Sequence, residues 1–265
     1  MAKNKKGENI PARLRAAKNV EDLNIIALEL AEQLMQDSEP SEAAHLLSEQ
    51  ARLEKVRNEI RTSLQTLYNR LESGTRVIIT MLQEMAQTNT EMNYNALLTD
   101  IKKIGAFFDN MPGREDEYRK QFIANMTIQE MCAISDATIE ALYQAAKCIY
   151  EKQHYEEAVD AFTFLTTING KKYVFWLALG NSEYFCQNYE AALQAYRVGG
   201  ELNPADPTYP LYAAACYEAM SDFDNALGAL ENTLNIIDYT KGDPALRHEV
   251  IAKREKIKNM KRRTK

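Results

Sequence analysis

Residues 173–207 read YVFWLALGNSEYFCQNYEAALQAYRVGGELNPADP, and this stretch decides the fold because its pattern recurs before and after it. The recurrence has a fixed interval of 34 residues, as from Ala158 to Ala192 and on to Ala226. Three further sets of positions keep the same interval: Ala146, Gly180 and Ala214; Tyr155, Tyr189 and Phe223; and Phe162, Tyr196 and Leu230. A fixed interval of this length, with small and bulky residues in a constant order, indicates stacked pairs of antiparallel helices.

The residue types within the interval fit the packing of such helix pairs. Alanine or glycine lets two helices approach where they cross, while aromatic side chains fill the space between successive pairs. Proline ends a helix because it lacks the N–H group, and we expect turns at residues 169–170 and 203–207. We therefore predict an all-α chain with three tetratricopeptide repeats over residues 139–238, forming a superhelix with a concave face.

Composition supports a helical protein. The chain has 265 residues, of which 45% are hydrophobic, with 10 glycines and 7 prolines. This length allows two modest domains or one repeat array with a large extension. Four cysteines lie far apart in the sequence, so we expect neither a disulfide framework nor a zinc module, and no cofactor.

Targeting signals are absent from the sequence pattern. Residues 1–7 are basic, but no apolar signal core follows them, and the chain has no run of about 18 apolar residues. We expect a protein without a signal peptide and without a membrane-spanning segment.

Charge is distributed unevenly along the chain. Residues 136–240 contain 5 basic and 15 acidic residues, whereas residues 241–265 contain 10 basic and 3 acidic residues. A basic tail of this kind suggests nucleic acid. However, residues 244–260 are periodic, with Leu246, Val250 and Ile257 on one face, so we favour a basic capping helix and tail over residues 241–265. Its lysines and arginines would form the solvated face of a terminal element, without direct contact to nucleic acid.

The amino-terminal half is also helical in its pattern. Residues 1–18 are polar and basic, which predicts a disordered start. Residues 19–112 form a helical region with a stripe from Val20 to Met35, followed by Leu46, Leu53, Ile60 and Leu67 at intervals of seven. Such heptads permit a coiled coil, and packing in a bundle fits equally well. We expect Gly74 to close this helix and residues 77–85 to form a separate short one.

A connector and leading helix are predicted over residues 113–138. The sequence Thr127-Ile128-Gln129-Glu130 has the form of a capping box and is expected to open the last helix before the repeats. We place a domain boundary near residues 112–126.

An enzyme is disfavoured by the sequence. The three histidines lie in separate predicted elements, and the chain shows neither metal-ligand spacing nor a glycine-rich phosphate loop. His154 stands at a predicted helix start where Asn188 and Asp222 stand in the other repeats, so we interpret it as a helix cap.

Part of the repeat sequence resembles a known family more closely than a generic repeat does. Residues 134–143, ISDATIEALY, and 149–158, IYEKQHYEEA, resemble the opening of the class II chaperones of bacterial type III secretion. The agreement continues through residues 175–180 and 188–192, and then through DPTYPLYAAACY at residues 206–217. The resemblance covers residues 127–240, and the long segment ahead of the repeats is a departure from the family.

This resemblance implies a cytoplasmic bacterial chaperone that works without ATP. Its concave groove would hold an extended, proline-containing amino-terminal segment of a hydrophobic translocator and keep that client soluble until secretion. In the family, aromatic residues at the positions of Tyr143, Tyr150 and Tyr155 help to form the peptide pockets. Packing between helices is the alternative role for these tyrosines.

Repeat-equivalent positions extend the candidate groove. Leu177 and Leu211 correspond to Tyr143, and Tyr184 corresponds to Tyr150. Lys147 and Asn181 lie one helical turn from Tyr143 and Leu177, where they are candidates to hydrogen-bond the client backbone.

A second function class stays open at this point. The repeats would then form a scaffold or a regulatory adaptor that binds a partner that is not exported. A transcription regulator is one such partner, because some translocator chaperones bind both kinds of protein. A homodimer is also open, because self-association in the family involves the amino-terminal segment, and the longer region in that place here would replace, block or strengthen it.

Overall fold

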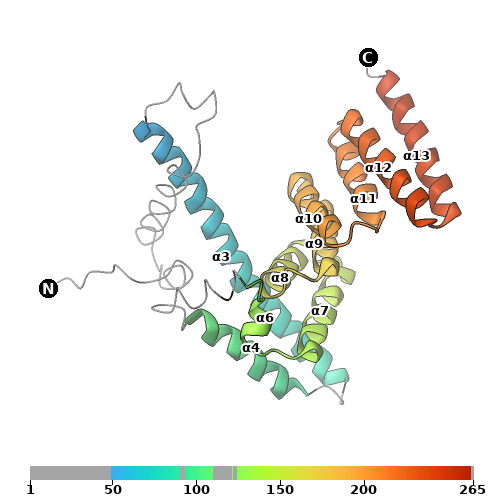
Figure 1. Cartoon of the computed structure of the whole chain (residues 1–265). Helices are drawn as coiled ribbons and strands as arrows, with labels where there is room; N and C mark the ends of the chain where they lie inside the picture. The colour runs from blue at the N-terminus through green and yellow to red at the C-terminus, as the bar shows by residue number, and fades with distance from the viewer. Residues whose placement is uncertain (1–48, 90–92, 110–120, 122–123, 264–265) are drawn as a thin grey trace. The chain divides into compact units, whose positions relative to one another are not determined.

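The computed structural model describes residues 49–89, 93–109, 121 and 124–263. Every regular element among them is a helix, which confirms the all-α prediction (Figure 1). The helices are α3 (Glu49–Thr88), α4 (Tyr94–Asp109), α6 (Ile128–Met131), α7 (Asp136–Glu151), α8 (Tyr155–Ile168), α9 (Tyr173–Phe185), α10 (Tyr189–Leu202), α11 (Thr208–Ala219), α12 (Phe223–Thr240) and α13 (Pro244–Arg263). The expected helix at residues 20–35 and the expected disordered start lie outside the described residues.

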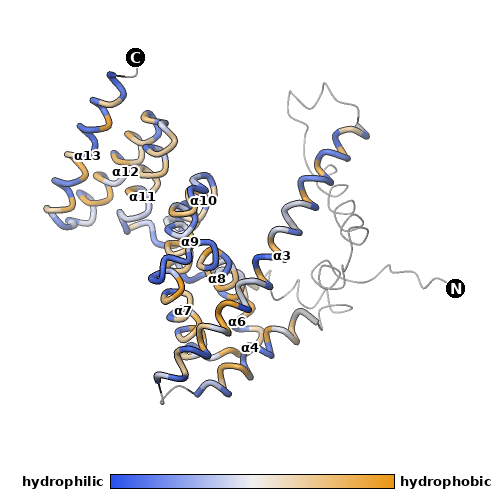
Figure 2. The backbone as a smooth tube through the Cα atoms, turned by 180° about the vertical axis from the view of Figure 1, so that it is seen from behind, coloured by the Kyte–Doolittle hydropathy of each residue, from blue (hydrophilic) through white to orange (hydrophobic). Residues whose placement is uncertain are grey.

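Helices α7 to α12 form three successive pairs that follow one another along the array, and α13 packs against α12 (Figure 1). The repeated alanines explain the close pairing, because Ala158, Ala192 and Ala226 are all completely buried. The prediction of tetratricopeptide repeats is therefore confirmed. Figure 2 shows that α13 is largely hydrophilic with isolated hydrophobic positions, in keeping with a terminal element.

In the middle repeat, the ring of Tyr196 leaves no room for a side chain at Gly180. A Cβ atom added at Gly180 would lie 2.4 Å from the ring of Tyr196, a separation that real Cβ atoms do not show. Gly199 has the same relation to Tyr209, at 2.3 Å. Small and aromatic positions of the 34-residue pattern therefore meet in space, which is why both recur.

The loop within each repeat contains a strained residue that the sequence pattern did not reveal. Gln153, Gln187 and Ser221 have positive φ angles of 63°, 63° and 61°. These residues also lie 34 apart, and none is a glycine, for which this conformation costs least. Each repeat therefore makes its tight internal turn with the same backbone conformation.

The interpretation of His154 as a capping residue of α8 is confirmed in position only. His154 occupies the position before α8, but its side chain makes no capping hydrogen bond. Its Nδ1 atom instead lies 3.2 Å from Oε2 of Glu157. In the third repeat, by contrast, Oδ1 of Asp222 accepts a hydrogen bond from the backbone N–H of Asn225 at 3.2 Å.

Helix α3 does not end at Gly74 as expected, but continues to Thr88. A Cβ atom at residue 74 would lie 2.2 Å from the backbone oxygen of Asp160 in α8. The glycine therefore permits close contact between two helices instead of closing one. Residues Ile78 and Leu82, one and two turns further along, are almost fully buried.

Contacts divide the chain into two compact units. One contains residues 74–89 and 139–265, so the last turns of α3 belong with the repeats. The described parts of residues 49–73 and 90–138 belong to the other unit. Most of residues 112–126 lies outside the described residues, so the boundary proposed there stays a prediction.

The second of these units contains the predicted capping box. Oγ1 of Thr127 accepts a hydrogen bond from the backbone N–H of Glu130 at 3.2 Å, and the Glu130 carboxylate accepts one from the backbone N–H of Thr127. The helix that it opens, α6, is only four residues long, and Ile128 packs there against Phe107 of α4. The expected leading helix is therefore a single turn.

A polar cluster joins α4 to the beginning of α7 within the same unit. Thr138 donates a hydrogen bond from Oγ1 to Oδ2 of Asp100 at 2.6 Å, and Lys103 pairs with Oδ1 at 2.6 Å. Burial opposes ionisation of Asp100, but the hydrogen bonds from Lys103 and Thr138 outweigh it and hold the pKa of this carboxyl below its usual value.

The middle repeat holds the single tryptophan of the protein. Nε1 of Trp176 donates a hydrogen bond to the backbone oxygen of Gly170 at 2.8 Å, which ties α9 to the turn before it.

Among the described residues, no helix is long and apolar enough to cross a membrane.

Candidate functional site

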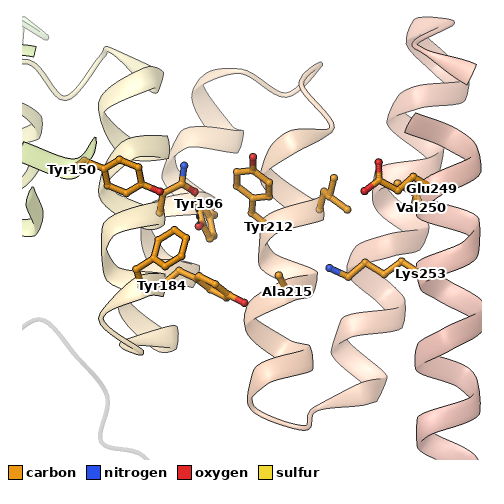
Figure 3. A pocket seen from close by; sticks show the side chains of 11 residues that line it. Tyr150, Tyr184, Tyr196, Tyr212, Ala215, Glu249, Val250 and Lys253 are labelled. Carbon is orange, nitrogen blue, oxygen red and sulfur yellow. Dashed lines mark hydrogen bonds between the residues drawn. The ribbon is translucent and has the colours of Figure 1, made fainter. Parts of the chain in front are cut away.

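A pocket of about 390 Å³ lies on the inner side of the repeat array. The first helix of each pair supplies most of its walls, together with α10 and α13 (Figure 3). The lining residues are Tyr150, Asn181, Tyr184, Phe185, Tyr196, Leu211, Tyr212, Ala215, Glu249, Val250 and Lys253. We call this hollow the inner pocket.

The floor of the inner pocket is built around a buried tyrosine. Tyr196 is 2% exposed, and its hydroxyl donates a hydrogen bond to Oδ1 of Asn181 at 2.8 Å. Burial raises the pKa of Tyr196 far above its usual value, and burial also raises the pKa of Tyr150 and of Tyr184. These three phenols therefore remain protonated at any physiological pH. The proton of Tyr196 is used by Asn181, which leaves the hydroxyls of Tyr150 and Tyr184 to donate to a ligand.

Aromatic side chains continue from the pocket to the solvent. Tyr155 stacks on Phe185 with ring centroids 4.6 Å apart and an interplanar angle of 12°. Tyr150 meets the edge of both rings, at 5.5 Å from Tyr155 and 6.0 Å from Phe185. Phe185 is 50% exposed, so the group presents apolar surface to the outside. We call Tyr150, Tyr155, Tyr184 and Phe185 the aromatic cluster.

The opposite wall comes from α13 and carries charge. Figure 3 shows the side chain of Lys253 extending from α13 into the pocket. Its Nζ atom lies 3.6 Å from Oε2 of Glu218, while Nζ of Lys256 lies 3.1 Å from Oε1 of the same carboxylate. The wall is thus held by cations of α13 that reach acidic residues of the third repeat.

The expectation that the cations of α13 form only a solvated face therefore needs correction. Nη1 of Arg254 lies 2.8 Å from Oε2 of Glu231, and Lys261 pairs with Asp224. The physical reason is the acidic surplus of the repeats, since carboxylates on α11 and α12 lie within reach of the basic helix.

Four of the eight candidate groove residues line the inner pocket, namely Tyr150, Asn181, Tyr184 and Leu211. Tyr155 belongs to the aromatic cluster beside it. That these residues bind a peptide stays a prediction.

The other three candidates lie elsewhere. Tyr143 packs against Phe175 and Phe162, with ring centroids 5.4 and 6.2 Å apart, and Leu177 packs against the buried cluster of the middle repeat. Lys147 is exposed and pairs with Glu151 at 3.6 Å. Their positions follow the repeat pattern, but none of the three lines the pocket.

The residues that α13 contributes cannot be found from the sequence pattern, which predicts a terminal cap there and gives no sign of a pocket wall. The 34-residue interval contained a signal for one missed residue, since Ala215 follows Asn181 by 34. The 34-residue pattern predicts Tyr196 as a bulky packing residue, and the structure shows that it also lines the pocket.

The cysteines and acidic residues give no sign of metal chemistry in the described part of the chain. No group of three or more histidine, cysteine, aspartate or glutamate side chains is placed there to hold a metal ion. Burial raises the pKa of Cys132 and of Cys216 to about 11, so both thiols stay protonated and unreactive.

Comparison with known proteins finds sequence similarity to one kind of curated bacterial protein. No family model matches the chain. It is 31% identical over 90 residues to low calcium response locus protein H of Yersinia pestis, covering 34% of this chain and 54% of that protein. The chain thus spans about half the length of the curated relatives it matches.

Two solved structures of type III secretion proteins are similar to part of the chain, and the first of them supports the repeat fold. A type III secretion complex from Aeromonas hydrophila matches with a TM-score of 0.51 and 19% identity, over 55% of this chain and 97% of that one. The translocator chaperone SycD of Yersinia enterocolitica matches with a TM-score of 0.46 and 26% identity, over 49% and 97%. The resemblance stated from the sequence is confirmed.

Proposed function

We propose that this chain is a bacterial chaperone of type III secretion that binds an extended amino-terminal segment of a hydrophobic translocator. The observation that carries the proposal is a coincidence of two independent patterns. Residues in the stretches that resemble the family, Tyr150 and Leu211 among them, also line the inner pocket. The similarity to the Yersinia protein supports the same class of function.

The chemistry of the pocket suits an extended peptide. Such a peptide presents side chains on alternate sides and leaves its backbone carbonyls available to donors. Tyrosine rings supply apolar area at low cost in side-chain entropy, and their hydroxyls supply the donors. Asn181 accepts from Tyr196 through its oxygen, which leaves its amide nitrogen to donate to a ligand.

The size of the pocket limits what it holds. A volume of about 390 Å³ lies at the lower end of ordinary ligand sites, so it takes a few side chains and not a folded domain. The remainder of the segment would lie along the exposed aromatic cluster. Covering an apolar segment in this way keeps a membrane-active client from aggregating in the bacterial cytoplasm, and burial supplies the affinity without ATP.

Co-purification tests the proposal most directly. The full-length chain, tagged and isolated from its native cell, should carry a protein with long apolar segments, which mass spectrometry identifies. If the stable partner is instead a protein that is not exported, such as a transcription regulator, the chain is an adaptor and the proposal is wrong.

Two tyrosines provide the matching test of the site. Replacing Tyr150 and Tyr184 together by alanine should weaken binding of the captured segment by about 2–4 kcal/mol, the range for central aromatic anchors. Isothermal titration with the corresponding synthetic peptide measures the loss. Tyr239→Ala is the control, because Tyr239 is 89% exposed on α12 and should leave affinity unchanged.

Circular dichroism melting must show that the double variant is folded. Wild-type affinity in a folded double variant would place the binding site outside the inner pocket.

A further inference from the structure

One column of residues changes character along the inner side of the array. Tyr150 of α7, Tyr184 of α9 and Glu218 of α11 follow one another at intervals of 34, and Lys253 of α13 comes 35 residues later. The first two belong to the aromatic cluster, whereas the last two lie 3.6 Å apart as a charged pair. The inner pocket therefore has an aromatic end and an ionic end.

Lys253 is the least satisfied charge at the ionic end. Its side chain is only 28% exposed, and 3.6 Å is longer than a normal hydrogen bond. Lys256 already neutralises Glu218 at 3.1 Å. Within the described part of the chain, no acceptor lies at hydrogen-bond distance from the Lys253 ammonium, although this group has three N–H donors.

The surroundings of Lys253 favour an anionic ligand over a cationic one. Leu211, Ala215 and Val250 supply an apolar lining, and the tyrosine hydroxyls nearby are donors. Glu249 is the acidic residue that lines the pocket, but it is exposed and therefore well hydrated. A partly desolvated ammonium gains more from a new carboxylate than a hydrated carboxylate gains from a new cation.

We propose that the ionic end recognises an aspartate or glutamate of the bound peptide, next to an apolar residue. The apolar side chain would contact Leu211 and Val250, while the carboxylate pairs with Lys253. Glu218 keeps Lys256 as its partner, so the new pair forms without leaving a buried charge unpaired. This inference rests on the proposed function, because it specifies which peptides the same pocket selects.

A randomised library of displayed 12-residue peptides tests this without a known client. The full-length chain is compared with Lys253→Met, which keeps the length of the apolar stem, and with Lys253→Glu. Lys258→Met is the matched control, because Lys258 lies on the same helix, pairs with Glu255 and does not line the pocket.

The wild-type chain should enrich acidic residues beside an apolar residue roughly tenfold, the factor expected for one charge-assisted hydrogen bond. Lys258→Met should keep this preference and Lys253→Met should lose it. Lys253→Glu should select lysine or arginine at the same position. A purely structural role of Lys253 would not reverse the selected charge.

The outcomes separate the two proposals. If neither the wild-type chain nor any variant selects a peptide family, the proposed peptide-binding function itself is wrong. If peptides are selected without an acidic preference, with a basic one, or with the same acidic preference by Lys253→Met, only this inference is wrong. A second test needs no variant and repeats the peptide selection on the wild-type chain at low and at high salt. An acidic preference that is the same at both salt concentrations would also overturn this inference.

Discussion

The two ends of the repeat array are covered in different ways. At the first repeat, residues 74–88 of α3 contact α8 so closely that Gly74 has no room for a side chain beside Asp160. At the third repeat, α13 buries Val250 and Ile257 completely and surrounds them with ion pairs to α11 and α12.

This difference shows that one requirement, covering the apolar face of a terminal repeat, has two physical solutions. Backbone contact is rigid and insensitive to the solvent, because no charge takes part in it. Ion pairs at a surface are screened by salt and respond to pH. We therefore expect the last repeat, beside the inner pocket, to respond more strongly to salt than the first repeat, where a single pair joins Lys152 to Glu84 among the contacts described.

The largest effect is expected from Gly74→Ala. The added Cβ would meet the carbonyl oxygen of Asp160 at 2.2 Å, and backbone cannot move aside as a flexible side chain does. We expect a loss of about 3 kcal/mol in the free energy of unfolding. Urea titration measures it, and Gly105→Ala is the control, since a Cβ there would meet nothing within 4 Å. A Gly74→Ala variant as stable as the parent would remove the proposed rigid contact.

Substitutions in the apolar contacts at the two ends of the array should each have a smaller effect on stability, and the effect should be the same at both ends. Ile78 is 1% exposed at the first end, and Ile257 is 0% exposed at the other. Changing either to valine should cost about 1 kcal/mol, because each variant loses one buried methylene group. Unequal costs, by more than about 1 kcal/mol, would mean that the ends also differ in apolar packing.

Individual ion pairs should contribute less. Arg254→Met removes the pair with Glu231, whose carboxylate side chain is 57% exposed, and should cost about 0.5 kcal/mol at low salt. Raising the salt concentration should bring the variant and the parent together. Lys152→Met tests the pair between Lys152 and Glu84 at the first end, which is 2.7 Å long. If Lys152→Met changes the salt dependence of stability and Arg254→Met does not, the first end is the salt-sensitive one and the comparison between the ends is reversed.

Lowering the pH should reveal the smallest difference in stability between a variant and the parent. A hydrogen bond from Arg247 holds the pKa of Asp238 below its ordinary value of 3.8. A carboxyl whose pKa is lower in the folded chain stabilises the fold above its unfolded pKa and loses that contribution as the pH falls through the folded value. Asp238→Asn should therefore show a weaker loss of stability below about pH 4 than the parent does. Identical acid-unfolding curves would show that this pair has no effect.

The repeats were predictable because their packing is periodic. Ala192 and Gly180 recur at a fixed interval since each meets a bulky side chain at a helix crossing, and such contacts leave a regular trace in the sequence. The same periodicity predicts Tyr150 and Tyr184 at equivalent positions, and both line the inner pocket.

Features that depend on contact between distant segments were not predictable in this way. Gly74 reads as a helix end in isolation, and only the position of Asp160 reveals its role. Lys253 reads as a solvated cation until the carboxylate of Glu218 is placed beside it. The left-handed conformation of Gln153 escaped notice because no glycine marks it.

Trp176 has a consequence for how unfolding is observed. It is the single tryptophan of the protein and its indole is tied to the turn before α9, so fluorescence excited at a wavelength that tyrosine does not absorb reports on the centre of the array alone. Circular dichroism, in contrast, averages over every helix. If the ion-paired end opens first as salt rises, ellipticity should fall before the emission shifts, and the delay between the two signals measures how far opening proceeds from the last repeat toward the middle one.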